Sequence, residues 1–288
     1  MKKYELTSET KVINGVELHQ IKALNSFGNI KEGDLGGWIE SEKNLSQYGD
    51  AWVYDNAVVF NNARVYNNAR VCGNARVYNN ATVGGDAFIS GKATVFENAT
   101  VGGYAFISEK ATVFGNARIL GDARVGGHAT VCGNAIVSEN ATVRGKVWVC
   151  GNATVSGNAM IEDYAKVYDN AMVSDNAIVS GNATVSGNAK VEGNATVEGN
   201  SKVRGKEDFI VFKNWWSSGR YFTWTRSNNK WNAGCFYGSG EELIAKAYKD
   251  SEKSGREYER VVNYVNDIIK EEDNENRNKR EDCPLRGV

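Results

Sequence analysis

Residues 93–104 read ATVFENATVGGY, and they contain two copies of the six-residue pattern that decides the fold. The pattern, in its commonest form Ala-x-Val-x-Gly-Asn, runs from Ala51 to Lys206 as 26 hexads without an insertion. The Val column is β-branched in every hexad, and the Ala column departs only at Val147 and Ser201. Such a repeat predicts a solenoid in which each hexad is one short strand followed by a tight corner.

The two inward columns predict a narrow and completely filled interior. Three strands would close a triangular coil of 18 residues, so 26 hexads would form between eight and nine coils. At the spacing of neighbouring strands, about 4.8 Å, the stack would be roughly 42 Å tall. Gly and Asn at the corners tolerate positive φ, and stacked valines suit parallel ladders around a crowded axis. The chain is therefore expected to be mainly β.

The segments on either side of the hexads are expected to be separate domains. Residues 1–48 contain Asn14-Gly15 between two strand-like runs, which predicts a hairpin that caps the repeat region at 49–205. Residues 206–270 are expected to form a small β-β-β-α-α domain. The mixed-charge tail at 271–288 has few apolar residues and is expected to be disordered.

The expected strands and helices of the C-terminal domain follow from local patterns. Strand-like runs lie at Phe209–Phe212, Tyr221–Arg226 and Lys230–Phe236. Helix starts are indicated by two capping-box patterns, Ser239 with Glu242 and Ser254 with Glu257.

These motifs resemble those of a known family. The hexads, preceded by LHQIKAL and GDLGGWIESEKNLS, resemble the YdcK-like hexapeptide-repeat proteins, whose fold is a left-handed parallel β-helix. NWWSSGRYFTWT through CFYGSGEELIAKAY is similar to a C-terminal domain carried by phage and prophage proteins. The resemblance implies the handedness, which the spacing does not, and it implies a homo-oligomer, with a trimer favoured. The family is often labelled acyltransferase, but a fold alone does not define an activity.

One column of corner residues could serve such an activity. Residues 18 apart lie along one edge, which brings Lys92, Lys110, His128 and Lys146 together, with Arg144 nearby. One interpretation is an anion site for phosphate or coenzyme A, in which His128 would be the general base. The alternative is a row of solvated corner residues, and the uninterrupted repeat leaves no loop to close a cleft. His19, in the cap, is expected to be structural.

A second column carries aromatic side chains and two cysteines. Its aromatic members are expected to lie on an oligomer-forming face or to stabilise the sheet by stacking; they are Phe60, Tyr78, Phe96, Phe114 and Tyr168. Cys132 and Cys150 occupy neighbouring coils. Without a leader-like segment at the N-terminus, a reducing cytoplasm is expected, so the five cysteines would be thiols rather than a disulfide framework, and no metal site is expected.

The C-terminal domain contains a candidate recognition loop. Ten aromatic residues lie between Phe209 and Tyr237, and most are expected to be core. Trp215, Trp216 and Arg220 fall in an expected loop, where they would bind a partner or dock onto the last coil. Positive and negative charges are balanced, at a net charge of −1, which favours neither duplex nucleic acid nor a membrane.

Three functions follow from these features. The leading hypothesis is a non-enzymatic binding or scaffold protein, phage-encoded, which acts without a cofactor on a host protein or a small signalling molecule, including one of host defence. The alternative is an acyltransferase that uses a coenzyme A thioester, with His128 as base. A structural particle or fibre component is the third.

Overall fold

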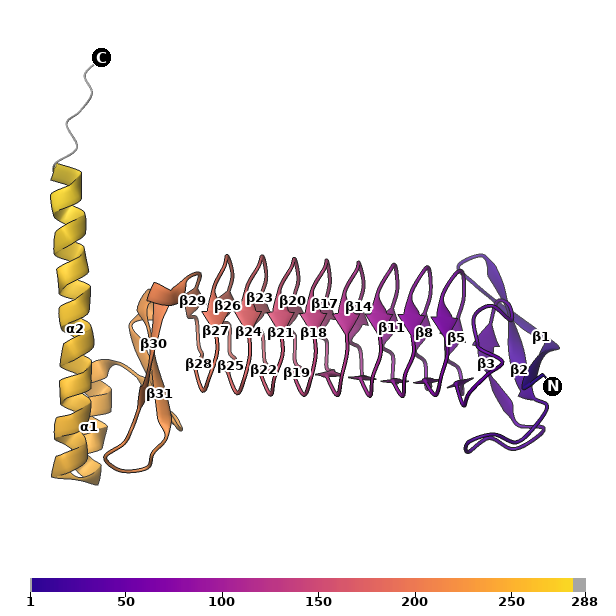
Figure 1. Ribbon diagram of the computed structural model, residues 1–288, viewed down its shortest axis with the longest axis horizontal. Coiled ribbons are helices and arrows are strands. Elements are labelled where there is room, and N and C mark those ends of the chain that lie inside the picture. The colour runs from indigo at the N-terminus through magenta and orange to yellow at the C-terminus, as the bar shows by residue number, and fades with distance from the viewer. Residues whose placement is uncertain (1, 282–288) are drawn as a thin grey trace, which may run out of the picture. The chain divides into compact units, whose positions relative to one another are not determined.

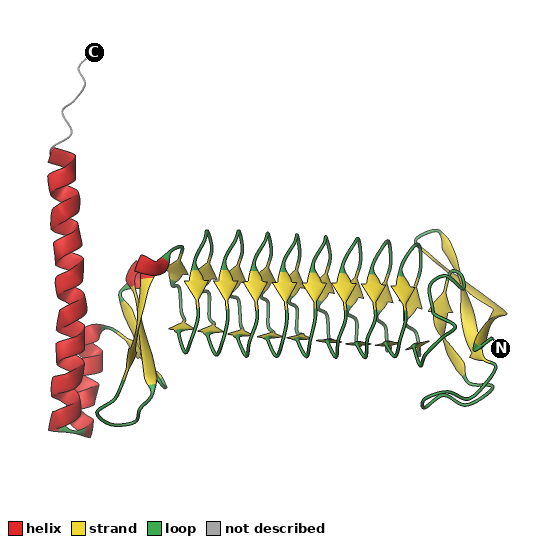
Figure 2. Ribbon diagram, in the orientation of Figure 1, coloured by secondary structure: helices red, strands yellow, loops and turns green. Residues whose placement is uncertain are grey.

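The computed structural model describes residues 2–281 of the 288-residue chain (Figure 1). The chain divides into two compact units, one ending at Phe209 and the other beginning at Ile210. The first is a parallel β-solenoid preceded by a hairpin, and the second combines a small sheet with two helices (Figure 2). The prediction of a mainly β hexapeptide solenoid with two C-terminal helices is confirmed.

Each hexad contributes a two-residue strand to one of three parallel sheets, which form the faces of the solenoid. The first face contains β5 (Val58–Val59), β8 (Arg76–Val77), β11 (Thr94–Val95), β14 (Thr112–Val113), β17 (Thr130–Val131), β20 (Trp148–Val149), β23 (Lys166–Val167), β26 (Thr184–Val185) and β29 (Lys202–Val203). The second face contains β6 (Arg64–Val65), β9 (Thr82–Val83), β12 (Thr100–Val101), β15 (Arg118–Ile119), β18 (Ile136–Val137), β21 (Thr154–Val155), β24 (Met172–Val173) and β27 (Lys190–Val191). The third face contains β4 (Trp52–Val53), β7 (Arg70–Val71), β10 (Phe88–Ile89), β13 (Phe106–Ile107), β16 (Arg124–Val125), β19 (Thr142–Val143), β22 (Met160–Ile161), β25 (Ile178–Val179) and β28 (Thr196–Val197).

The pairing register places every residue above the one 18 positions earlier. Val95 pairs with Val77 on one side and Val113 on the other, and the same step holds along each face. The inward Ala and Val side chains of these coils are fully buried. Burying one Val side chain contributes about 1.5–3 kcal/mol, so the repeated core stabilises every coil without a large side chain.

The N-terminal hairpin extends the first face. β1 (Tyr4–Ile13) and β2 (Val16–Ala23) pair antiparallel around Asn14 and Gly15, both of which have positive φ as a two-residue turn requires. β2 pairs with β3 (Leu35–Ile39), and β3 pairs in parallel with β5. β3 therefore covers the hydrogen-bonding edge of this face at its N-terminal end, and the hairpin covers β3 in turn.

The C-terminal unit has one strand more than the sequence predicted. Its antiparallel sheet contains β30 (Phe209–Lys213), β31 (Tyr221–Thr225), β32 (Lys230–Ala233) and β33 (Phe236–Gly238). The predicted third strand is split because Gly234 adopts a φ of +65° and turns the chain. Two short 3-10 helices, η1 (Lys206–Asp208) and η2 (Arg226–Asn228), precede β30 and β32.

Two helices complete this unit. α1 (Gly240–Asp250) begins at the predicted capping box, where Ser239 Oγ accepts from the Glu242 N–H and Glu242 accepts from the Ser239 N–H. α2 (Glu252–Glu281) begins earlier than predicted, because Ser251 Oγ accepts from the Ser254 N–H at 3.1 Å. α2 extends through residues 271–281, where the sequence predicted a disordered tail, and residues 282–288 of that tail lie outside the described part.

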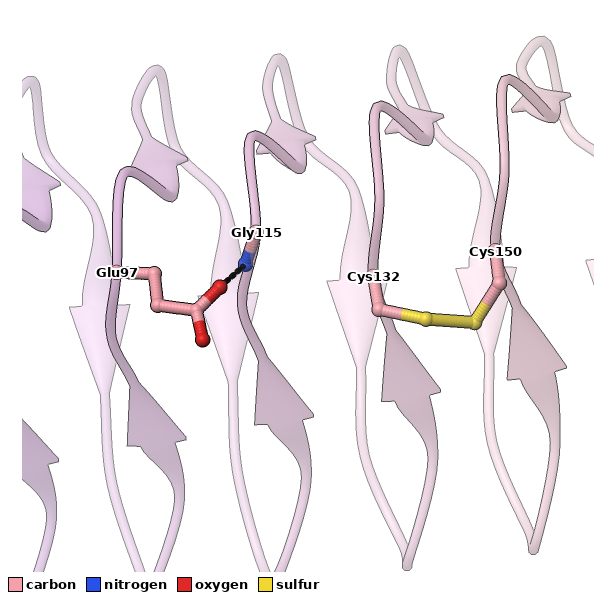
Figure 3. Close-up of a disulfide and its surroundings, with 4 residues drawn as sticks. All are labelled: Glu97, Gly115, Cys132 and Cys150. Carbon is pink, nitrogen blue, oxygen red and sulfur yellow. Dashed lines mark hydrogen bonds between the residues drawn. A yellow bond between two sulfur atoms is a disulfide. The ribbon is translucent and has the colours of Figure 1, made fainter.

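The structure corrects the expectation that all cysteines are thiols. Cys132 and Cys150 form a disulfide between adjacent coils, with their Cα atoms 4.6 Å apart (Figure 3). The parallel ladder already holds these Cα atoms close, so the bond requires no distortion of the coils. Cys72 and Cys235 are free. Within residues 2–281 no helix is long and apolar enough to cross a membrane, and a cytoplasmic location stays a prediction.

Candidate functional site

The predicted cationic column lies at the corner between the third and first faces, here called the cationic corner. Lys92, Lys110, His128 and Lys146 occupy the same position in successive coils, and all four are exposed. Their backbone N–H groups each donate to a carbonyl of the next coil at 2.6–2.9 Å. The ladder therefore brings together the four side chains that the sequence placed in one column.

The charges at this corner are largely offset. Arg144 Nη2 lies 2.6 Å from Glu162 Oε1. Glu109 is the neighbour of Lys110 in the sequence and lies at the same corner of that coil. Lys146 Nζ lies 5.4 Å from the centre of the Tyr164 ring. Within residues 2–281, no hydrogen bond or ion pair fixes the imidazole of His128. A general base is usually oriented by a partner group, and the described residues provide none for His128.

The aromatic column lies at the corner between the first and second faces, here called the aromatic corner. Phe60, Tyr78, Phe96 and Phe114 stack in series, with ring centroids 5.0 Å apart at each step. Phe60 is buried against Leu18 of the hairpin, whereas the next three rings are half-buried. The disulfide continues the column, and Tyr168, 37% exposed, lies beyond it. The structure therefore shows stacking along the column.

The aromatic corner also holds an asparagine ladder that the sequence analysis missed. Side-chain amides donate to the amide oxygen of the next coil at 2.9–3.2 Å; the members are Asn62, Asn80, Asn98, Asn116, Asn134, Asn152, Asn170 and Asn188. The repeated Asn at an interval of 18 is the signal in the sequence for this ladder, although Asn at a corner also suits the turn. The amide groups at this corner therefore hydrogen-bond to one another and stabilise the stack of coils.

Acidic residues at left-handed corner positions form a second feature that was missed. Glu97 has a φ of +58°, and its Oε2 accepts from the Gly115 N–H at 2.9 Å in the next coil (Figure 3). The same bond joins Asp163 to Gly181 and Asp175 to Gly193. These carboxylates accept hydrogen bonds from backbone N–H groups, and residues 2–281 contain no cluster of three or more His, Cys, Asp or Glu side chains placed to hold a metal ion.

The predicted recognition loop is held in a defined conformation. Asn214 is buried, and its Oδ1 accepts from both the N–H and the hydroxyl of Ser217 at 3.0 Å. Its backbone N–H donates to the Arg220 carbonyl, and its carbonyl accepts from the Gly219 N–H, both at 2.8 Å. A single buried asparagine therefore closes the loop from both sides.

The two tryptophans of this loop have different environments. Trp216 is only 9% exposed and contacts Phe222 and Tyr258, so it belongs to the hydrophobic core of the C-terminal unit. Trp216 is therefore part of this core, whereas the sequence predicted that it would bind a partner or dock onto the last coil. Trp215 is 71% exposed, and Arg220 is exposed as well. The rigid loop thus holds one large apolar side chain in solvent.

Comparison with known proteins identifies the type of repeat. The YdcK β-solenoid repeat family matches residues 69–85, 123–139 and 165–181, all within the solenoid. A protein of Escherichia coli strain K12, described as the uncharacterized acetyltransferase YdcK, is 36% identical over 63 residues. That alignment covers 19% of this chain and 19% of the relative, so the similarity concerns the repeats and a small part of each protein.

Proposed function

Three segments of the solenoid match the YdcK β-solenoid repeat, and we propose that the chain is a binding scaffold whose C-terminal unit recognises a partner protein through Trp215. The observation that carries the proposal is the 71% exposure of Trp215 on a loop closed by buried Asn214. A preorganised loop loses little conformational freedom on binding, and tryptophan is among the residues that contribute most at protein interfaces.

The expected partner is a protein of the host cell, because this unit resembles domains of phage-encoded proteins. Arg220, at the end of the same loop, would supply a charged contact beside the apolar one. Trp216 would act indirectly, since its burial anchors the loop from below. The scaffold is proposed to act in the cytoplasm and to form a homo-oligomer, and neither a cofactor nor a metal has a role in this proposal.

The test compares two exposed tryptophans. The tagged chain and its variants are purified from host cells, and the co-purifying polypeptides are quantified. Trp215→Ala should reduce recovery of a specific partner by roughly 30-fold, the effect of losing about 2 kcal/mol at an interface hot spot. Trp148→Ala is the matched control, because Trp148 is 57% exposed on the solenoid. Equal recovery with both variants would overturn the proposal.

A second candidate function is acyl transfer at the cationic corner. It is supported by the description of the Escherichia coli relative as an uncharacterized acetyltransferase and by the position of His128 between Lys110 and Lys146. The lysines would hold the phosphates of a coenzyme A thioester, and His128 would remove a proton from the acceptor. Glu109 and Glu162 oppose this binding electrostatically, which places it behind the first proposal.

The two histidines provide the test of acyl transfer. Coenzyme A binding is measured by calorimetry for the unmodified chain, for a Lys110→Gln/Lys146→Gln double variant and for His128→Gln. The double variant should lose affinity, whereas His128→Gln should retain binding but lose transfer to an amine acceptor. His19→Gln is the control, since His19 lies in the N-terminal hairpin. No binding at millimolar coenzyme A would exclude this function.

A further inference from the structure

The C-terminal unit contains a small hollow that shares only Arg220 with the proposed functions. Its volume is about 180 Å³, and it lies among the end of the Trp215 loop, the turn between β32 and β33, and helices α1 and α2. Clefts that accept drug-sized ligands usually have volumes of about 300–1,000 Å³. The hollow is therefore too small for a nucleotide or for coenzyme A, and it suits a ligand of amino-acid size.

Three charged side chains line this hollow without neutralising one another. Arg220 and Lys246 contribute positive charge, and Asp250 contributes negative charge. Within residues 2–281, none of the three forms an ion pair, although such charges commonly pair when they can approach. Lys246 Nζ is held 5.5 Å from the centre of the Phe236 ring. The guanidinium of Arg220 lies beside Gly234, 3.6 Å from where a Cβ atom would be.

Tyr258 adds a hydrogen-bond donor to the same lining. Its hydroxyl oxygen accepts from Asn214 Nδ2 at 3.0 Å, which leaves the hydroxyl hydrogen free to donate elsewhere. Burial is the main cause that raises the pKa of Tyr258, so this hydroxyl keeps its proton at neutral pH. The hollow thus offers two cations and a hydroxyl donor to anionic groups, and one carboxylate to a cationic group.

We propose that this hollow binds a small acidic amino acid, a ligand with two carboxylates and one ammonium group. Arg220 and Lys246 would each receive a carboxylate, and Asp250 would receive the ammonium. Two positive charges and one negative charge in the site complement two negative charges and one positive charge in the ligand. All three charged side chains are exposed, so a ligand in the hollow can reach them.

The proposal goes beyond partner recognition and can fail independently of it. Arg220 belongs to both sites, so the variants used here are Lys246→Gln and Asp250→Asn on α1. Trp215 does not line the hollow. Both variants should recover the partner protein as the unmodified chain does. Trp215→Ala should still bind the amino acid. The two proposals therefore give different patterns across the same set of proteins.

The first test measures ligand binding by the full-length chain. L-Glutamate is titrated calorimetrically, and glutarate, which lacks the amino group, is the matched probe. Glutamate should bind the unmodified chain about tenfold more tightly than glutarate does. Asp250→Asn should remove that preference, and Lys246→Gln should weaken both ligands about tenfold. Lys249→Gln, on the same helix but outside the hollow, should bind as the unmodified chain does.

A second test uses a cysteine as a reporter. Cys235 lines the hollow and is exposed, whereas Cys72 lies half-buried in the solenoid. Glutamate should slow alkylation of Cys235 and leave Cys72 unchanged, as followed by peptide mass spectrometry. Thermal unfolding midpoints verify that each variant folds. Glutamate that neither binds nor protects Cys235, or inorganic phosphate that binds as tightly as glutamate, would overturn the proposal.

Discussion

At the residue scale, the corners of the solenoid depend on a backbone conformation that glycine adopts without strain. Gly115 has a φ of +75°, and a Cβ atom added there would lie 2.8 Å from the Gly133 carbonyl oxygen. Gly115→Ala should therefore lower the free energy of unfolding by about 1–3 kcal/mol, as measured by chemical denaturation. Gly102→Ala is the control, because a Cβ there meets only Leu120 at 3.6 Å. Equal losses in both variants would contradict this explanation.

Lys3 gives the N-terminal hairpin a pH dependence. Its Nζ donates to the Gly49 and Ala51 carbonyls at 3.2 and 2.8 Å, and burial lowers the pKa of Lys3 to about 8 from 10.5. Between these values the unfolded chain binds more protons than the folded chain, so this group makes stability rise with pH in that window. Relative to Lys3→Met, the unmodified chain should gain stability between pH 8 and 9.5, as measured by urea unfolding.

The upper limit of that window is set by a neighbouring group. Burial raises the pKa of Tyr4, so above pH 10 its ionisation in the unfolded chain would begin to reduce stability. Measurements below pH 9.5 separate the two effects. Parallel pH profiles of the unmodified chain and Lys3→Met across the window would show that Lys3 is not the titrating group.

At the element scale, the disulfide joins two coils of the same ladder. Closing an 18-residue loop is expected to stabilise the folded chain by up to about 3 kcal/mol through restriction of the unfolded state. A reductant should lower the thermal unfolding midpoint of the unmodified chain and of Cys72→Ser. The Cys132→Ser/Cys150→Ser double variant should show the lower midpoint with or without reductant. A midpoint that is insensitive to both changes would contradict a stabilising role.

The start of α2 offers a direct comparison between two serines. Ser251 Oγ accepts from the Ser254 N–H, so Ser251 is the residue that caps the first turn. Ser251→Ala should cost about 1 kcal/mol, as is typical for loss of an N-cap. Ser254→Ala should cost less, because its hydroxyl does not cap the helix in this structure. Both costs are measurable by chemical denaturation. A larger cost for Ser254→Ala than for Ser251→Ala would instead support the capping box predicted at Ser254.

The elements that could be predicted from the sequence are those that residues close together in the chain determine. The Val and Ala columns, the Asn14-Gly15 hairpin and the Ser239 capping box are each fixed by residues within a few positions. The Cys132–Cys150 bond could not be deduced, because spacing gives proximity but not oxidation state. The carboxylate bonds to glycine also escaped prediction, because they join corners 18 residues apart.

The candidate sites were predictable only in part for the same reason. Coil register placed Lys110, His128 and Lys146 together, but it did not show that Glu162 would pair with Arg144. In the C-terminal unit, adjacent tryptophans in one loop gave no indication that Trp216 would enter the core while Trp215 stayed exposed. The hollow beside Lys246 is formed by four segments that no repeat relates to one another. Side-chain environment of this kind depends on tertiary packing.

At the scale of the whole molecule, the chain contains a regular solenoid and a C-terminal unit with its own core, and the two differ in how they use their surface residues. In the solenoid, corner residues form ladders of amides, rings and carboxylates that stabilise neighbouring coils. The C-terminal unit contains the exposed Trp215 and the unpaired charges of the small hollow. The first unit therefore supplies structural regularity, and we propose that the second supplies recognition.

Native mass spectrometry of the chain purified gently from host cells tests this assignment most directly. We expect an oligomer that retains a second polypeptide, keeps it in Trp148→Ala and loses it in Trp215→Ala. An oligomer, including the trimer implied by the resemblance, that retains coenzyme A and no second polypeptide would contradict the account. That result would move the function to the cationic corner and to His128.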